Sequence, residues 1–109
     1  MDMSKRTVLC GANAYEQKYY FNERFKQLPM SIQEELHIIS VLFTEEVGGI
    51  FTMIFEEDGR LSLEVMAEEE DILYDEIASG LYIREIQRKK QDLMEALTMF
   101  YKVFILGER

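Results

Sequence analysis

Several residue types that often carry structure or chemistry are scarce in this chain of 109 residues, which has no tryptophan, one proline, one cysteine and one histidine. The single cysteine, Cys10, excludes a disulfide within the chain and any site built from several cysteines. No apolar run approaches the roughly 18 uncharged residues of a membrane span, and the first residues lack the apolar core of a signal peptide. We expect a cytoplasmic protein with no membrane partner.

Positive charge is scarce as well. The 12 lysines and arginines face 21 aspartates and glutamates, so the net charge of -9 should repel nucleic acid and anionic lipid. The balance is +2 over residues 1–30, -13 over residues 31–83 and +2 over residues 84–109. This segregation favours attraction between the middle and the ends of the chain, within one copy or between two, as well as attraction of an outside cation. Pairing within the protein is the simplest of these interpretations.

Hydrophobic residues are plentiful, at 48% of the chain, which is enough to bury a core without a disulfide or a structural metal. No Gly/Ser-rich linker interrupts the sequence. Residues 1–109 are therefore predicted to form a single domain.

A helix is predicted over residues 31–47. Ser31 and Glu34 follow Pro29 with the spacing of a capping box, and a Gly-Gly pair offers a left-handed position at the other end. Apolar side chains recur between them at helical spacing, at Ile32, Leu36, Ile39 and Phe43. The β-branched residues leave a strand as the alternative over residues 36–45.

A β-hairpin is predicted next, from residues 50–57 and 60–67 around Asp58-Gly59, a pair suited to a type I′ turn. The second strand alternates apolar and polar residues and so has one buried face. The first strand is apolar on both faces, one of which holds Phe51, Met53 and Phe55. Such a strand needs a cover on each side, so we expect a second layer from the N-terminal segment or from another subunit.

The rest of the chain is predicted to be helical over residues 71–106, with a hinge at Ser79-Gly80. Spacings of three and four residues produce a heptad-like stripe: Ile83, Ile86, Lys90, Leu93, Leu97, Phe100 and Phe104. The stripe packs either on the sheet of the same chain or against a second subunit. Its apolar members therefore join Phe51, Met53 and Phe55 as interface candidates.

The densest acidic segment begins at Met66 and reads MAEEEDILYDE. If a helix begins near residues 69–71, four acids could surround Mg²⁺ or Mn²⁺: Glu68, Asp71, Asp75 and Glu76. Carboxylates are, however, favoured at the start of any helix, and Ile72, Leu73 and Ile77 would dock such a helix. Because no second cluster of acids converges on this one, we interpret the segment as a solvated helix start. The four acids remain weak metal candidates, and no cofactor is expected.

Cys10 and His37 are the only residues of their types, so a nucleophilic pair is available by count alone. Lone cysteines are usually buried, and His37 lies among apolar residues of the predicted helix. A structural role is the simpler interpretation of both. No glycine-rich phosphate-binding motif is present.

Four segments, in chain order, point to a known family: VLCGANAYEQKYYFN, LFTEEVGGIFT, EEDGRLSLE and EEDILYDEI. In them the chain resembles a family of small uncharacterised bacterial proteins that form a domain of unknown function. The resemblance extends from about Val8 to Gly107. It implies a stand-alone cytoplasmic bacterial protein, and it transfers no activity, cofactor or catalytic residue.

The fold is therefore predicted to be α+β, an antiparallel sheet around a central hairpin with one helix before it and a long C-terminal helical region packed on it. A homodimer is expected. The predicted function is a non-enzymatic, self-associating interaction module that presents an acidic surface to another protein. The alternative is a small hydrolase-like enzyme that depends on a divalent cation bound by acids at residues 68–76.

Overall fold

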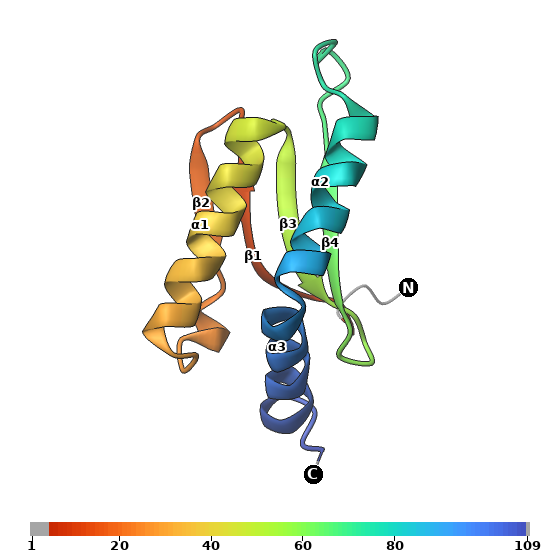
Figure 1. Ribbon diagram of the computed structural model, residues 1–109. Helices are drawn as coiled ribbons and strands as arrows, with labels where there is room; N and C mark the ends of the chain where they lie inside the picture. The colour runs from red at the N-terminus through yellow and green to blue at the C-terminus, as the bar shows by residue number, and fades with distance from the viewer. Residues whose placement is uncertain (1–4, 109) are drawn as a thin grey trace.

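The computed structural model describes residues 5–108 and consists of a four-stranded antiparallel sheet with three helices on one of its faces (Figure 1). The strands lie in the order β2-β1-β3-β4 and are β1 (Thr7–Asn13), β2 (Lys18–Phe21), β3 (Ile50–Phe55) and β4 (Leu61–Met66). The helices are α1 (Met30–Glu46), α2 (Glu76–Lys89) and α3 (Gln91–Phe104), and a 3-10 turn, Glu23–Phe25, precedes α1. The predicted α+β class is confirmed.

The helix predicted over residues 31–47 is confirmed as α1, and the strand alternative over residues 36–45 is wrong. Leu36, Ile39 and Phe43 line the buried face of α1, because side chains three and four residues apart share one side of a helix. The helical period of the apolar residues therefore outweighs the preference of β-branched residues for strands.

The predicted capping box that begins at Ser31 is wrong. Pro29 precedes α1 with φ -54° and ψ 144°, and its carbonyl oxygen accepts hydrogen bonds from the backbone N–H groups of Ile32 and Gln33. The helix therefore begins one residue earlier than predicted, at Met30, and no side chain caps it.

The predicted hairpin is confirmed as β3 and β4, but its turn is not type I′. Gly59 has φ +94°, whereas Asp58 keeps a negative φ, and a type I′ turn needs positive φ at both positions. The N–H of Gly59 donates to the Glu56 carbonyl at 2.9 Å, and the Asp58 carboxylate accepts from the N–H of Arg60. These bonds produce a longer loop, and each strand stops one or two residues short of its predicted end at the turn.

The N-terminal segment extends the sheet and does not cover it. Because β1 pairs with both β2 and β3, the prediction that this segment supplies a second layer is wrong. A register shift between Val8 and Cys10 forms a bulge that places both Leu9 and Cys10 in the core. The helices lie on this inner face, and within residues 5–108 no element covers the opposite face (Figure 1).

The helical C-terminal region predicted over residues 71–106 consists of two helices, but they meet at a different residue from the predicted hinge. α2 begins five residues later than predicted, because the Asp75 carboxylate accepts from the N–H groups of Ile77 and Ala78 and so caps it. The predicted hinge at Ser79-Gly80 is wrong, since α2 continues through it. The break falls at Lys90, with φ -112° and ψ 30°, between α2 and α3.

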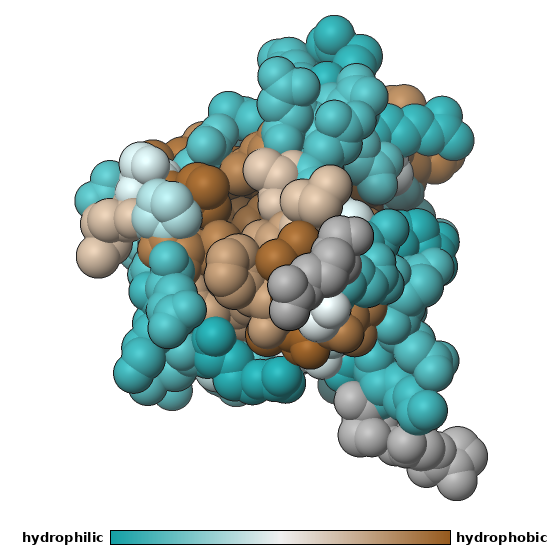
Figure 2. All heavy atoms as spheres, turned by 90° about the horizontal axis from the view of Figure 1, so that it is seen from below, coloured by the Kyte–Doolittle hydropathy of each residue, from teal (hydrophilic) through white to brown (hydrophobic). Residues whose placement is uncertain are grey.

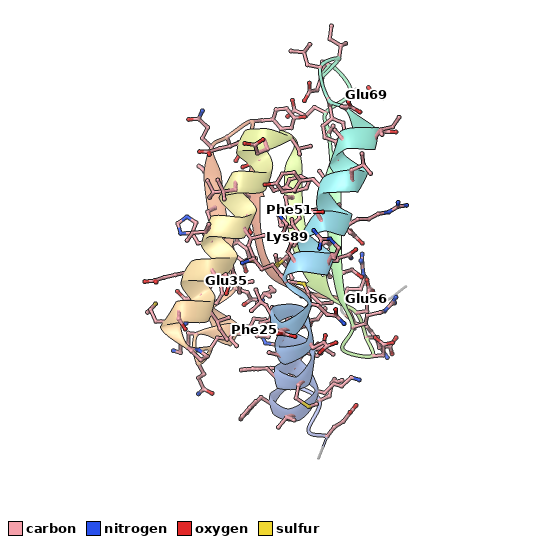
Figure 3. All side chains as sticks on the ribbon, viewed as in Figure 1. Phe25, Glu35, Phe51, Glu56, Glu69 and Lys89 are labelled. Atoms are coloured by element: carbon pink, nitrogen blue, oxygen red, sulfur yellow. The ribbon has the colours of Figure 1, made fainter. Side chains whose placement is uncertain are left out.

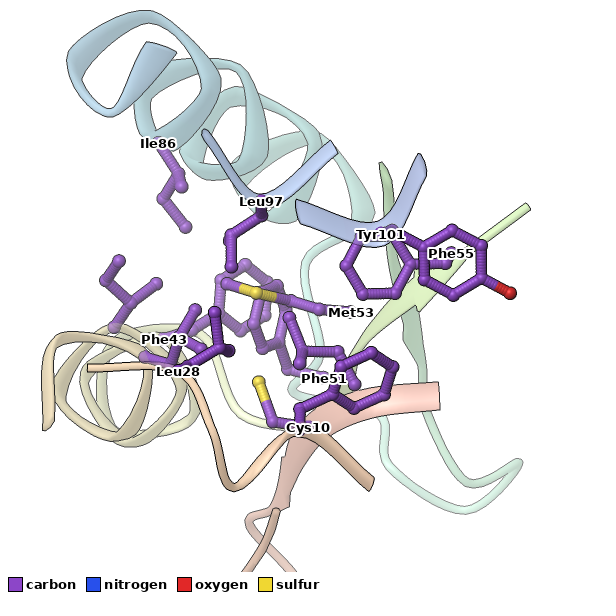
Figure 4. Close-up of a cluster of buried hydrophobic side chains, with 13 residues drawn as sticks. Cys10, Leu28, Phe43, Phe51, Met53, Phe55, Ile86, Leu97 and Tyr101 are labelled. Carbon is purple, nitrogen blue, oxygen red and sulfur yellow. The ribbon is translucent and has the colours of Figure 1, made fainter. Parts of the chain in front are cut away.

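Aromatic side chains dominate the core between the sheet and the helices (Figure 4). Phe51 of β3 stacks on Phe43 of α1 with ring centroids 4.5 Å apart, and Phe55 stacks on Tyr101 of α3 at 4.3 Å. All four are buried. Since aromatic side chains bury large apolar areas, the two stacks fasten α1 and α3 to the central strand.

Candidate functional site

The acidic segment connects β4 to α2 and is held by polar side chains. The Tyr15 hydroxyl donates to Oδ2 of Asp71 at 2.6 Å and accepts from the N–H of Glu68 at 3.1 Å. The Tyr74 hydroxyl donates to Oγ of Ser79 at 2.7 Å. The bond to the Asp71 carboxylate favours the protonated phenol, so the pKa of Tyr15 is raised. The segment therefore has a fixed path although most of its side chains are exposed.

The four metal candidates have other roles or positions. Asp71 binds the Tyr15 hydroxyl and the N–H of Leu73, and Asp75 caps α2. Glu68 and Glu76 are exposed to solvent. Within residues 5–108, no three histidine, cysteine, aspartate or glutamate side chains lie close enough together to hold a metal ion. The two aspartates thus shape a turn and a helix start.

Cys10 and His37 are engaged separately. Cys10 is fully buried, its Sγ lies 3.8 Å from Oγ of Ser40, and burial raises the pKa of its thiol to about 11. The His37 ring stacks on Tyr19 with centroids 4.2 Å apart. A thiol with a raised pKa is a poor nucleophile near neutral pH, so this geometry supports a structural role for both residues.

Eight of the nine predicted interface residues lie in the core of their own chain. Five are buried: Phe51, Met53, Phe55, Ile86 and Leu97. Three are half-buried and pack against them: Ile83, Leu93 and Phe100. The ninth, Phe104, is exposed. Of the two alternatives for the stripe, the structure therefore shows packing on the sheet of the same chain.

A different set of apolar side chains faces solvent around the start of α2. Ile72 and Leu73 are each 90% exposed, Ile77 is 77% exposed and Leu81 is 59% exposed. We call these four residues the outer apolar patch. The prediction that Ile72, Leu73 and Ile77 dock the helix is wrong, because all three are exposed, whereas Ile86, nine residues after Ile77, is buried. At about 100° per residue, nine residues place two side chains on opposite sides of a helix. The spacing of Ile77 and Ile86 in the sequence therefore indicates that only one of them can face the core.

A second unpartnered surface is the uncovered face of the sheet. A hollow of about 670 Å³ lies there, lined in part by Val8, Tyr20 and Ile50. No side chain fits at Gly11, since a Cβ at that position would lie 2.7 Å from the Phe51 carbonyl oxygen. The surface of this face is therefore recessed at Gly11. This face is apolar in its middle.

At the hairpin end, ion pairs cross the same face. Arg6 pairs with Glu56 at 2.9 Å and also with Glu64, and the Ser62 hydroxyl donates to Glu56 at 2.6 Å. Ile54, whose cross-strand neighbour is Ser62, is only 8% exposed beside this network. These salt bridges therefore cover part of the sheet face that no helix or strand of residues 5–108 covers.

A third exposed apolar group lies toward the end of α3: Met99, Val103, Phe104 and Leu106. Figure 2 views the molecule from its C-terminal end, and on the face seen there apolar side chains gather in the middle and polar ones surround them. Single exposed apolar residues are common on protein surfaces, whereas groups of them often mark interaction sites.

Comparison with known proteins identifies the family. The model of a family of unknown function, DUF6145, matches residues 6–109. The chain belongs to this family. The DUF6145 match begins one residue before β1 and includes every helix and strand, so the whole fold lies within it.

The other comparisons add no relative of known activity to this DUF6145 protein, because no curated protein and no solved structure matches the chain. In the described part of the chain, no helix is both long enough and apolar enough to cross a membrane.

Proposed function

We propose that this DUF6145 protein is a non-enzymatic interaction module that self-associates and presents its acidic surface to another protein. The observation that supports this most directly is the outer apolar patch, whose four large side chains are between 59% and 90% exposed. Exposed apolar surface is unfavourable in water, and groups of exposed apolar side chains are typical of protein contact sites. Ile72 and Leu73 lie within the densest acidic segment and Ile77 directly follows it, so the patch combines apolar contact with negative charge.

The fixed path of the segment supports a displayed surface. Tyr15 holds Asp71, Tyr74 holds Ser79, and Asp75 caps α2. Gly49, with φ +77°, lets the chain pass close to Tyr74, since a Cβ there would lie 3.2 Å from its ring. Polar contacts on one side of the segment therefore leave the apolar side chains pointing outward, and a partner would meet a surface that is already ordered.

The distribution of ion pairs supports an acidic surface. The basic ends do pair with the acidic middle, as Lys5 with Glu57, Arg6 with Glu56 and Glu64, and Lys90 with Glu35. Within residues 5–108, none of the six acids between residues 68 and 76 forms an ion pair. These unpaired carboxylates would attract a partner with basic side chains and speed its association.

Light scattering coupled to size-exclusion chromatography, over a concentration series with Mg²⁺ or with chelator, tests this proposal. A dimer whose mass and melting temperature are the same in both conditions is expected. The hydrolase alternative requires a rise in melting temperature with Mg²⁺ that Asp71→Asn with Asp75→Asn abolishes, since only binding to the folded state stabilises it. That result, or a monomer at every concentration, would contradict the proposed function.

A further inference from the structure

The solvent side of α2 carries a straight line of four side chains with two different characters. Ile77, Leu81, Arg84 and Arg88 are spaced four, three and four residues apart, which places them on one side of a helix, and all four are exposed. Ser79 and Ile86 are buried on the opposite side. The outward line is therefore apolar in its first half and basic in its second.

The two ends of α2 also carry opposite charges. Asp75 and Glu76 stand at its start, and Figure 3 shows Glu69 beyond that end and Lys89 near the other. From Glu76 to Arg88 the helix rises about 18 Å, so these charges cannot meet within one copy. Attraction between the two ends of α2 is satisfied only by a second molecule.

The basic half of the outward line on α2 carries more positive charge than its ion pairs neutralise. Arg84 forms no ion pair within residues 5–108. Arg88 and Lys89 share a single partner, Glu85, at 2.7 and 3.1 Å. Two cations on one exposed carboxylate leave net positive charge at this end of α2, which matches the unpaired acids at the other end.

We propose, as an extension of the proposed function, that the self-association surface is α2 and that its partner is α2 of a second copy in antiparallel orientation. With a two-fold axis near Gly80, Ile77 of each copy packs against Leu81 of the other. Arg84 of each copy then approaches Glu76 of the other, and Arg88 approaches the acidic segment. The arrangement is self-complementary, as a two-fold interface between identical chains requires.

Gly80 favours a close approach of the two helices. It lies in the interior of α2, next to the outward line, and a Cβ built there would meet no atom within 4 Å. A glycine at an exposed helix position lowers helix stability relative to alanine, and none of residues 5–108 lies close enough to Gly80 to require it. In the antiparallel pair it leaves room for the side chains of the second helix.

The uncovered sheet face is the rival surface for a second copy. Of its apolar side chains, Val8 and Tyr20 are 36% and 55% exposed, less than any member of the outer apolar patch, whereas Met66 at 69% lies within the range of that patch. The Arg6 network already covers the hairpin end of this face. Its ion pairs at the hairpin end join charges of opposite sign, whereas within residues 5–108 neither Arg84 nor the six acids at residues 68–76 form an ion pair. Charge complementarity therefore favours α2.

The test measures the dimer dissociation constant by sedimentation equilibrium. Leu81→Lys should raise it about a hundredfold or more, because the change puts like charge and a solvated group at the centre of the contact. Met66→Lys is the matched control, since Met66 is similarly exposed but lies on β4. It should leave the dissociation constant unchanged. Both positions are exposed in one copy, so both variants keep the fold, which circular dichroism checks.

A charge exchange tests the orientation. Glu76→Arg alone and Arg84→Glu alone should each raise the dissociation constant about tenfold, since each affects two symmetric pairs. The double variant restores both pairs with their signs reversed and should return to within about threefold of the wild type. No recovery in the double variant would overturn the antiparallel register.

The remaining outcomes separate this inference from the proposed function. A dimer that Met66→Lys dissociates and Leu81→Lys does not would place the interface on the sheet, overturning the inference while self-association stands. A wild-type protein that is monomeric at every concentration would overturn both.

Discussion

The aromatic core and the outer apolar patch are built from similar side chains in opposite surroundings. Phe51 and Phe55 are at most 1% exposed, whereas Ile72 and Leu73 are each 90% exposed. The difference does not come from hydrophobicity but from which side of each element faces the sheet. The first region stabilises one copy, and the second is the exposed apolar surface that we propose contacts another molecule.

α2 contains both situations within one helix. Ile86 packs into the core, and Ile77, two and a half turns earlier and on the opposite side of the helix, points to solvent. A helix that only covered the sheet would carry polar residues on its outer side. α2 therefore carries apolar residues on both its inner and its outer side, and variants that separate the two sides test this comparison.

The largest effect is expected for truncation in the core. Phe51→Ala should lower the free energy of unfolding by about 3–5 kcal/mol, since it removes apolar contact and leaves a cavity beside Phe43. Leu81→Ala should change it by about 0.5 kcal/mol or less, because this side chain is already exposed. Urea denaturation at low protein concentration measures both. Similar losses for the two variants would contradict the division into core and contact surface.

A smaller loss is expected where α2 begins. Asp75→Ala should cost about 1 kcal/mol, because it removes the acceptor for the N–H groups of Ile77 and Ala78. Asp75→Asn keeps that acceptor and serves as the control. Urea denaturation monitored by circular dichroism at 222 nm provides the measurement. If the alanine variant is as stable as the wild type, the outward display of the patch does not depend on this cap.

A gain in stability is expected at Gly80. In a single copy, Gly80→Ala should add about 0.5–1 kcal/mol to the free energy of unfolding, since the site is helical and open. Gly49→Ala is the contrasting control and should destabilise, because Gly49 has φ +77° and a Cβ would lie 2.8 Å from the Met66 carbonyl oxygen. Thermal unfolding of both variants at low concentration distinguishes them.

Periodicity predicted most of the fold. The period of α1 and the alternation of β4 each depend on local spacing, and the structure confirms both. Local spacing cannot show that β1 would insert beside β3, because that pairing joins residues about 40 positions apart. The sequence therefore predicts a cover from the N-terminal segment or from another subunit, whereas the N-terminal segment extends the sheet.

The candidate site was harder to predict for a different reason. The sequence predicts that Ile72, Leu73 and Ile77 dock the helix, and the structure shows instead that these side chains face solvent while Ile86 is buried. The roles of Asp71 and Tyr15 depend on a contact between residues 56 positions apart, which a cluster of acids does not reveal. Hydrophobicity indicates that a side chain prefers an apolar contact. Which side of the helix faces the sheet determines whether that contact lies within the chain.

Charged side chains show a similar contrast, between a carboxylate held in ion pairs and the exposed acids. The pH dependence of the free energy of unfolding tests this contrast, and its expected effect is the smallest. Hydrogen bonds from Arg6 and from Ser62 lower the pKa of Glu56 to about 2, from an ordinary value of 4.5. A carboxylate whose pKa is lower in the folded state stabilises the protein above its unfolded pKa, and this stabilisation is lost as the pH falls toward about 2. Glu56→Gln should therefore show a shallower loss of stability than the wild type between about pH 4.5 and pH 2. Urea denaturation across that range measures the difference, with Glu69→Gln in the acidic segment as the control. A constant difference between wild type and Glu56→Gln at every pH would show that the Arg6 pair does not distinguish this carboxylate from the exposed acids.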